Sequence, residues 1–173
     1  VEGDEDVPLT IAFWTNQTNG GTGVNEIALG NRWGIDGVDT NPREFIKFTP
    51  TKFEYHQAGN GSENVPYDEP IPDDVWTHHA IVKSDNLFTY YRNGEEVSSH
   101  ENSGAYTTFP QPLFAGGQRP GGGEHWSGAM ADVAVWGRSL DEDEVAAIAA
   151  DGIQAVTGFV DLDRDKDGMP NTY

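Results

Sequence analysis

Aspartates stand at alternate positions near the C-terminal end of the sequence, in the run DLDRDKDGMPNT that starts at residue 161. The pattern Asp-x-Asp-x-Asp-Gly supplies carboxylates, then a residue that permits a sharp turn, and then a backbone carbonyl. Calcium takes about six to eight such hard oxygen ligands in a flexible shell. The residues that match the ligand and turn positions of such a loop are Asp163, Asp165, Asp167, Gly168, Met169 and Asn171. We therefore expect this stretch to bind Ca2+ rather than to be a disordered acidic linker.

The register of this loop is fixed by its glycine. A frame that starts at Asp161 would place Lys166 at the glycine position, so that frame is rejected, although Asp161 stays a candidate ligand. The bidentate carboxylate that usually ends such a loop would fall after Tyr173, the last residue. We therefore expect a weakened affinity for calcium and a natural polypeptide that continues into further domains.

The sequence offers little that is arranged for catalysis. His78 and His79 are adjacent on an expected strand, so their side chains point to opposite faces and cannot chelate one metal ion together. We interpret them as packing residues, with His78 on the face of Trp76. Glycosidases need two carboxyl groups about 5 to 10 Å apart, whereas the expected strands REFIKF and KFEYH each carry a single acid. No serine or cysteine nucleophile motif occurs, and we expect a protein that is not an enzyme.

Aromatic side chains in or near expected loops suggest a different chemistry, which is stacking on the faces of sugar rings. Each of them could instead belong to the core. The candidates for glycan binding are Trp33, Tyr55, Tyr67, Tyr106 and His125.

Short β-type runs separated by turn residues fill most of the chain and predict an all-β fold. In LTIAFWT, residues 9 to 15, apolar residues alternate so that Ile11 and Phe13 share one face while Ala12 and Trp14 share the other. The stretch 49 to 51 predicts a tight turn. Asn93-Gly94 is a strong hairpin signal, because both residues tolerate a positive φ.

Only the stretch SLDEDEVAAIAAD, residues 139 to 151, reads as a helix. Ser139 is the expected N-cap, the acids from Asp141 to Glu144 favour the positive end of the helix dipole, and Gly152 ends it. Beyond it the run AVTGFV leads into the acidic tail. We therefore expect a single domain over residues 1–160 and a truncated calcium repeat or linker over 161–173.

Composition limits the classes of partner. Asp and Glu outnumber Lys and Arg by 29 to 10, which gives a net charge of −19. Such a chain repels the phosphates of nucleic acids and of anionic lipids. No apolar stretch approaches the length of about 20 residues that a membrane-spanning helix needs. We expect neither nucleic-acid binding nor membrane insertion. Cysteine is absent, so no disulfide can form.

Three stretches together resemble the laminin-G-like, concanavalin A-like jelly rolls of secreted bacterial multidomain proteins. They are PLTIAFW from residue 8, VWTHHAIVKSDNLFTYYRNGEEV from residue 75, and GGQRPGGGEHWSGAMADVAVWGRSLDEDEVAAI from residue 116. The resemblance spans roughly residues 8 to 150 and implies two antiparallel sheets packed face to face as a jelly-roll sandwich, with one short C-terminal helix. Separately, the tail resembles thrombospondin-type-3 and EF-hand-like calcium repeats.

The resemblance also implies roles for particular residues. An aspartate in the strand of Asp132 often holds a structural calcium in related domains, and Asp4 or Asp6 would be its helpers. Trp126 matches a position that the family fills with a buried aromatic. The family has a further strand before TIAFW, so the run Ala155 to Val160, or a segment of another chain, is expected to cover an open sheet edge. The glucanase signature Glu-x-Asp-x-x-Glu of this fold is absent.

The sequence therefore predicts a calcium-binding recognition module, secreted or at the cell surface, that binds a glycan or another cell-surface ligand in an adhesive role. The alternative is a structural spacer stiffened by calcium. A domain related to glycoside hydrolases or polysaccharide lyases is the third hypothesis.

Overall fold

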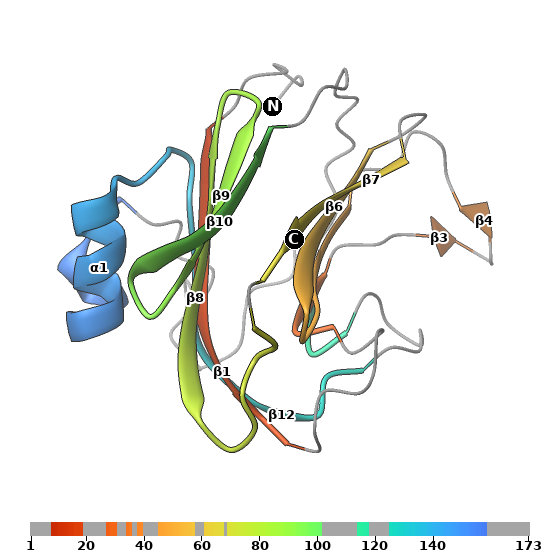
Figure 1. Cartoon of the computed structure of the whole chain (residues 1–173), viewed down its shortest axis with the longest axis horizontal. Helices are drawn as coiled ribbons and strands as arrows, with labels where there is room; N and C mark the ends of the chain where they lie inside the picture. The colour runs from red at the N-terminus through yellow and green to blue at the C-terminus, as the bar shows by residue number, and fades with distance from the viewer. Residues whose placement is uncertain are drawn as a thin grey trace.

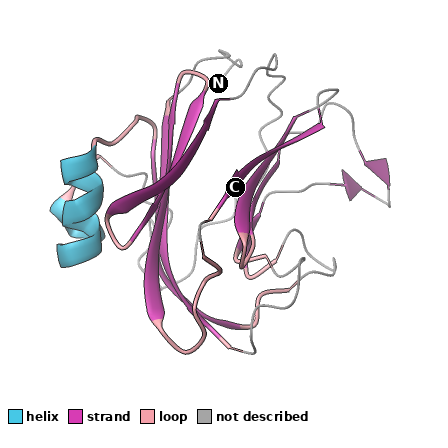
Figure 2. Ribbon diagram, viewed as in Figure 1, coloured by secondary structure: helices cyan, strands magenta, loops and turns pink. Residues whose placement is uncertain are grey.

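The computed structural model describes residues 8–18, 27–30, 34–35, 38–39, 45–57, 61–67, 69–101, 114–117 and 125–158. The described chain forms two five-stranded sheets that face each other, and a short helix lies on the far side of one of them (Figures 1 and 2). Every strand pair in these sheets is antiparallel. The predicted all-β sandwich is thus confirmed.

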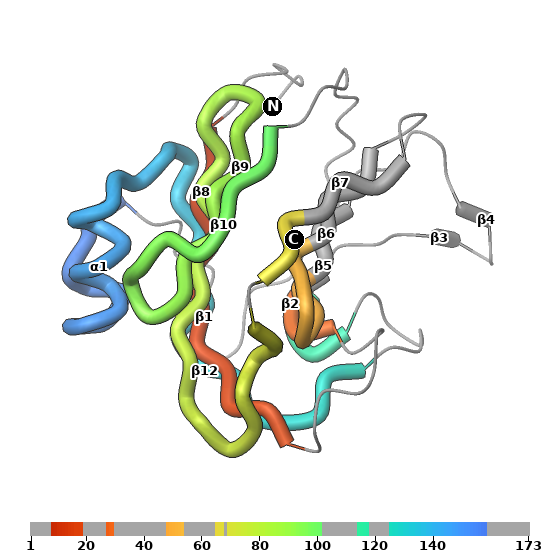
Figure 3. The backbone as a smooth tube through the Cα atoms, in the orientation of Figure 1, coloured from red at the N-terminus to blue at the C-terminus, as the bar shows by residue number. Residues whose placement is uncertain are grey.

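The first sheet, here called sheet I, is built from the longer strands. In spatial order these are β10 (Glu95–Glu101), β9 (Leu87–Arg92), β8 (Trp76–Ser84), β1 (Leu9–Gln17) and β12 (Gly128–Trp136). β1 and β12 lie side by side although they stand at opposite ends of the described chain (Figure 3). Sheet I is therefore complete only when two segments more than 100 residues apart have paired.

The second sheet, sheet II, has shorter strands. In spatial order these are β11 (Phe114–Ala115), β2 (Leu29–Gly30), β5 (Phe45–Phe48), β6 (Lys52–Gln57) and β7 (Gly61–Pro66). A separate pair is formed by β3 (Gly34–Ile35) and β4 (Val38–Asp39).

Aromatic side chains fill the space between the sheets. Phe13 of β1 meets Phe48 of β5 edge to face, with 4.6 Å between ring centroids. Phe53 of β6 continues the contact, 4.8 Å from Phe48 and 6.0 Å from Phe88 of β9. The alternation read in β1 is confirmed, since Ile11 and Phe13 point into this core while Ala12 packs in a second cluster on the opposite face.

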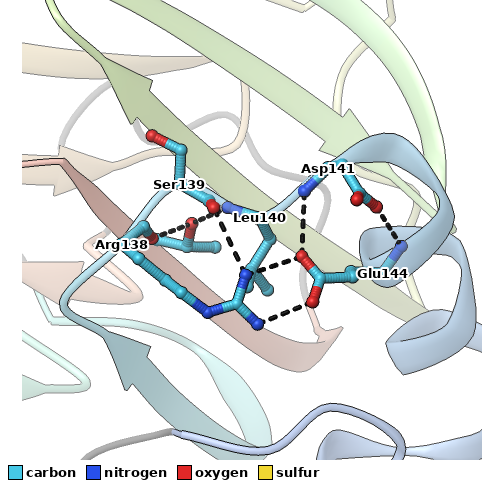
Figure 4. Close-up of polar contacts among 6 residues, drawn as sticks. Arg138, Ser139, Leu140, Asp141 and Glu144 are labelled. Carbon is cyan, nitrogen blue, oxygen red and sulfur yellow. Dashed lines mark hydrogen bonds and ion pairs between the residues drawn. The ribbon is translucent and has the colours of Figure 1, made fainter.

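The helix α1 (Glu142–Asp151) supplies that second cluster with Val145 and Ile148. The predicted N-cap was wrong, because Asp141 rather than Ser139 caps the helix. The Asp141 carboxylate accepts a hydrogen bond from the Glu144 amide at 2.9 Å, and the Glu144 carboxylate accepts one from the Asp141 amide at 3.1 Å (Figure 4). Ser139 instead donates to the carbonyl of Lys83 at 2.6 Å, which ties the entry of the helix to sheet I.

Both predicted turns are present. Asn93 and Gly94 join β9 to β10 with φ angles of 51° and 87°, as a tight hairpin requires. A Cβ on Gly94 would lie 3.1 Å from Cα of Ala146, so the glycine also lets α1 approach the hairpin. The turn at Pro50 is closed by a hydrogen bond from the Thr49 amide to the Lys52 carbonyl at 2.9 Å.

The run that was expected to cover a sheet edge takes a different path where it is described. A 3-10 turn, η1 (Ile153–Ala155), follows Gly152, and Val156 packs into the cluster beneath α1. The described residues 155–158 contribute no strand. Residues 159 and 160 lie outside the described part.

Candidate functional site

The outer face of sheet I, which points away from sheet II, is divided into two parts. Small and apolar side chains of β1, β8, β9 and β12 on one part pack against α1 and the residues around it. This covered cluster comprises Ala12, Ala80, Val82, Tyr91, Ala134, Trp136, Leu140, Val145, Ile148 and Val156. In Figure 1 the helix extends over only part of this face, and the end where β8 begins lies beyond it.

The other part of this face carries two tryptophans. The register pairs Asn16 of β1 with Trp76 on one side and Ala129 on the other, while Trp14 pairs with His78 and Ala131. Trp14, Asn16, Trp76, Ala129 and Ala131 are here called the outer platform. Trp76 is 47% exposed, and Val75 before it is 51% exposed. Trp14, Asn16 and Ala131 are half-buried, and Ala129 on the edge strand is exposed.

His78 lies behind this platform. Its ring is buried and contacts the Trp14 ring at 5.2 Å between centroids. Neither ring nitrogen has a hydrogen-bond partner within the described part of the chain. Burial lowers the pKa of His78 to about 4, so the imidazole is neutral at pH 7.

Acidic residues flank the platform residues in the sequence. Asp132 sits at an irregularity of β12 opposite Phe13, with a φ of 50° and an exposed side chain. Asp73 and Asp74 precede β8, and the Asp73 carboxylate accepts a hydrogen bond from the Gln17 amide group at 3.0 Å. The described residues contain no group of three or more His, Cys, Asp or Glu side chains suited to a metal ion. Calcium binding by Asp132 therefore stays a prediction, and Asp4 and Asp6 lie outside the described residues.

A second polar cluster lies inside the sandwich. His79 is bonded through one ring nitrogen to the Thr15 hydroxyl at 2.8 Å and through the other to the Tyr90 hydroxyl at 2.6 Å. Arg92 donates to the same Tyr90 oxygen at 3.4 Å. Burial holds the pKa of His79 well below its usual value and raises the pKa of Tyr90 to about 12. Because His79 is fully buried, it cannot touch a ligand, and its role is packing.

The predicted glycan-binding aromatics are not brought together in the described residues. Tyr67 is buried, with its ring stacked on Tyr90 at 4.2 Å and the Arg92 guanidinium 5.2 Å from its centroid. His125 is exposed, and its ring lies against Gly117. Tyr55 belongs to β6, paired with Ile46 and Glu63.

The remaining predicted site residues lie outside the described part of the chain. These are Trp33, Tyr106, Asp161, Asp163, Asp165, Asp167, Met169 and Asn171. Their predicted roles are untested by the structure. Trp126, which the sequence assigned to the core, is buried there.

The sequence analysis missed the outer platform as a site. One signal was present, since the alternation of β1 already placed Trp14 on the face opposite the core. A single short helix can cover only part of a sheet. The pairing of Trp14 with β8 and β12 requires the register, which the sequence did not provide.

Solved structures share this fold at low sequence identity. Domain 4 of AbnA, an extracellular GH43 arabinanase from Geobacillus stearothermophilus solved with arabinotriose, aligns with a TM-score of 0.66 and 14% identity over 84% of this chain and 68% of that one. A heptameric SAP-like pentraxin from Limulus polyphemus aligns at 0.61 and 19%, over 86% and 73%. The CBM40 domain of a Ruminococcus gnavus sialidase, bound to α2,3-sialyllactose, aligns at 0.60 and 15%, over 83% of each chain.

No curated protein matches the chain significantly in sequence. In the described part of the chain, no helix is both long and apolar enough to cross a membrane. The model of one family, described as the concanavalin A-like lectin/glucanases superfamily, matches residues 3–146. That match covers most of the sequence and agrees with the two-sheet fold, so the chain belongs to this superfamily.

Proposed function

We propose that this chain is a non-catalytic carbohydrate-binding module. The observation that carries the proposal is the exposed Trp76 beside the half-buried Trp14 on the outer face of a concanavalin A-like sandwich, beyond the cluster that α1 covers. Exposed aromatic patches of this kind mark binding surfaces, since an indole presents a large apolar face together with a polar N–H group. Neighbours of the same fold, solved with arabinotriose and with sialyllactose, support this assignment.

Binding without chemistry is supported by the residues themselves. The glucanase signature of the fold is missing from the sequence. The described histidines of β8 are buried, and His79 has both nitrogens engaged by Thr15 and Tyr90. A glycosidase would need paired carboxyl groups facing a common substrate position.

A glycan array with the full chain tests the proposal. We expect binding to one family of oligosaccharides, reproduced by calorimetry in solution. Incubation of the same oligosaccharides with the chain is expected to release no new reducing ends. A blank array, or steady product formation, would contradict the assignment.

We also propose that the Asp-rich stretch from Asp161 binds Ca2+ and that the module acts outside the cell, joined to further domains. The support is the Asp-x-Asp-x-Asp-Gly spacing of residues 163 to 168, which supplies hard oxygen ligands. Calorimetric titration of the chain with CaCl2, repeated with MgCl2, tests the ion. If neither CaCl2 nor MgCl2 gives a heat of binding, this part of the proposal is wrong.

A further inference from the structure

We propose that the outer platform is the surface that binds the glycan and that its ligand is a glycan without carboxylate, sulfate or phosphate groups. This inference rests on the carbohydrate-binding function proposed above. It places the site on the outer face of sheet I, away from the aromatics that the sequence singled out.

The register builds the platform across three adjacent strands. Trp76 of β8 faces Asn16 of β1, and Trp14 lies diagonally from Trp76 because it pairs with His78 two residues further along β8. Diagonal neighbours on one face of an antiparallel pair lie about 7 to 8 Å apart, within reach of aromatic side chains. The two indoles therefore lie on the same face of the sheet, Trp76 exposed and Trp14 half-buried against His78, with the amide of Asn16 on that face as donor and acceptor.

The platform reaches β12, which is the edge strand of sheet I among the described residues. Ala129 and Ala131 of the edge strand β12 are opposite Asn16 and Trp14, and Ala129 is exposed. Side chains this small leave room for a ring to lie over β1. On the other half of the face, by contrast, Ala12, Ala80 and Ala134 are fully covered by the α1 cluster. Those alanines lie beneath the helix α1. Ala129 and Ala131 are not part of that cluster, so α1 does not cover the platform.

Polar residues stand next to the platform residues in the sequence, and sugar sites combine an apolar face with a few placed polar groups. Asp132 follows Ala131 on β12 and is exposed, and Asp73 and Asp74 lie just before Val75 and Trp76. Carboxylates accept hydrogen bonds from hydroxyl groups. Behind Trp14, His78 holds two ring nitrogens without a partner in the described residues, so this face differs from a purely apolar packing surface.

Charge decides the class of glycan. The chain carries a net charge of −19, and the charged residues nearest the platform in sequence, Asp73, Asp74 and Asp132, are all acidic. The negative field of the chain therefore opposes the binding of an acidic glycan. The same field opposes a second copy of this chain as the occupant, because dimerisation would bring two strongly acidic surfaces together.

The test measures binding of a neutral array hit to the full chain and to three variants by calorimetry. Trp76→Ala removes the exposed indole face, so it is expected to weaken binding about tenfold or more, which is about 1.4 kcal/mol. Trp76→Phe, which keeps an aromatic face, is expected to stay within about threefold of the wild type. Leu87→Ala is the matched control, since Leu87 is an exposed apolar residue of the same sheet at 42% exposure but pairs with Ser84 at the far end of β8.

The same array compares neutral glycans with their sialylated forms, and we expect the sialylated forms to bind more weakly. Glycan binding that survives Trp76→Ala unchanged would overturn this site while leaving the proposed function intact. A preference for acidic glycans would overturn the ligand class. A blank array would instead remove the function on which the inference rests. The free chain could instead sediment as a dimer, and Trp76→Ala could convert it to a monomer. That result would assign the platform to self-association and overturn the proposal.

Discussion

Two adjacent histidines on β8 have opposite environments because successive strand residues face opposite sides of the sheet. His79 points between the sheets, stacks on Phe13 at 5.2 Å and uses both ring nitrogens in hydrogen bonds. His78 points outward behind Trp14, and neither of its nitrogens is bonded within the described residues. Both imidazoles are held neutral by burial, so both couple stability to pH.

Replacing His78 by leucine is expected to flatten the acid side of the stability profile. The folded pKa of His78, about 4, lies below the unfolded value of 6.5, so the unfolded chain binds the proton more readily. The stability that neutral His78 contributes is complete above pH 6.5 and is lost as pH falls towards 4, by about 1.4 kcal/mol per pH unit. Urea unfolding of wild type and His78→Leu between pH 7 and pH 5 measures the difference.

At pH 7 the same variant is expected to be no less stable than the wild type. It removes two buried nitrogens that have no hydrogen-bond partner among the described residues, and such groups cost about 1 to 3 kcal/mol each when left unbonded. Equal slopes of stability against pH in the two proteins would show that His78 titrates as it does in the unfolded chain.

Tyr90→Phe is expected to destabilise the fold by about 1 to 3 kcal/mol, because it leaves a buried nitrogen of His79 without its partner. Tyr91→Phe is the matched control on the next residue, since the Tyr91 ring packs in the α1 cluster on the opposite face. Chemical denaturation at pH 7 compares the two. A cost at Tyr91 as large as that at Tyr90 would mean that the hydrogen bond to His79 is not what the Tyr90 hydroxyl contributes.

At the scale of elements, local sequence signals predicted those features that depend on a few neighbouring residues. The alternation of β1, the Asn93-Gly94 hairpin and the helix end at Gly152 are of this kind. Ser139 was a plausible cap by type, yet tertiary structure engages its hydroxyl with the carbonyl of Lys83. Asp141 is the N-cap instead, because it forms the reciprocal hydrogen bonds of a capping box with Glu144.

The candidate site was beyond prediction for a physical reason. Whether Trp14 is covered depends on where α1 packs and on which residue of β12 faces it, and both are set by contacts between segments more than 100 residues apart. Tyr67 shows the converse error, because its position near a loop did not reveal that its ring is buried against Tyr90 and Arg92.

Asp141→Ala is expected to cost about 1 kcal/mol, because it removes the side-chain acceptor for the Glu144 amide at the first turn of α1. Asp143→Ala is the control, since Asp143 is an acid of the same turn that is exposed and does not cap the helix. The Asp143→Ala variant should lose only the smaller interaction of a carboxylate with the helix dipole. Denaturation midpoints measure both, and equal losses would assign the stabilisation to charge at the helix end rather than to the capping box.

At the scale of the whole molecule, an acidic chain with a proposed calcium site should respond to chelation. Ion binding to the native state alone stabilises it by mass action, about 2.7 kcal/mol when free calcium is 100 times its dissociation constant. We therefore expect EGTA to lower the melting temperature and excess CaCl2 to restore it. The matched variant carries Asp163→Ala, Asp165→Ala and Asp167→Ala together and should melt at one temperature with or without EGTA. A wild-type melt unchanged by EGTA would contradict a calcium contribution to stability.

The net charge of −19 predicts a separate response to salt. Repulsion among like charges destabilises the compact state more than the expanded one, and salt shortens the range of that repulsion from about 8 Å at 0.15 M to about 3 Å at 1 M. In EGTA, which removes the calcium term, the melting temperature should therefore rise as NaCl increases over this range. Binding of an uncharged glycan to the outer platform should change little over the same range, because no ion pair forms in the complex. A melting temperature that falls with NaCl would mean that specific ion pairs, such as that of Arg138 with Glu144 at 2.6 Å, outweigh the repulsion between acids.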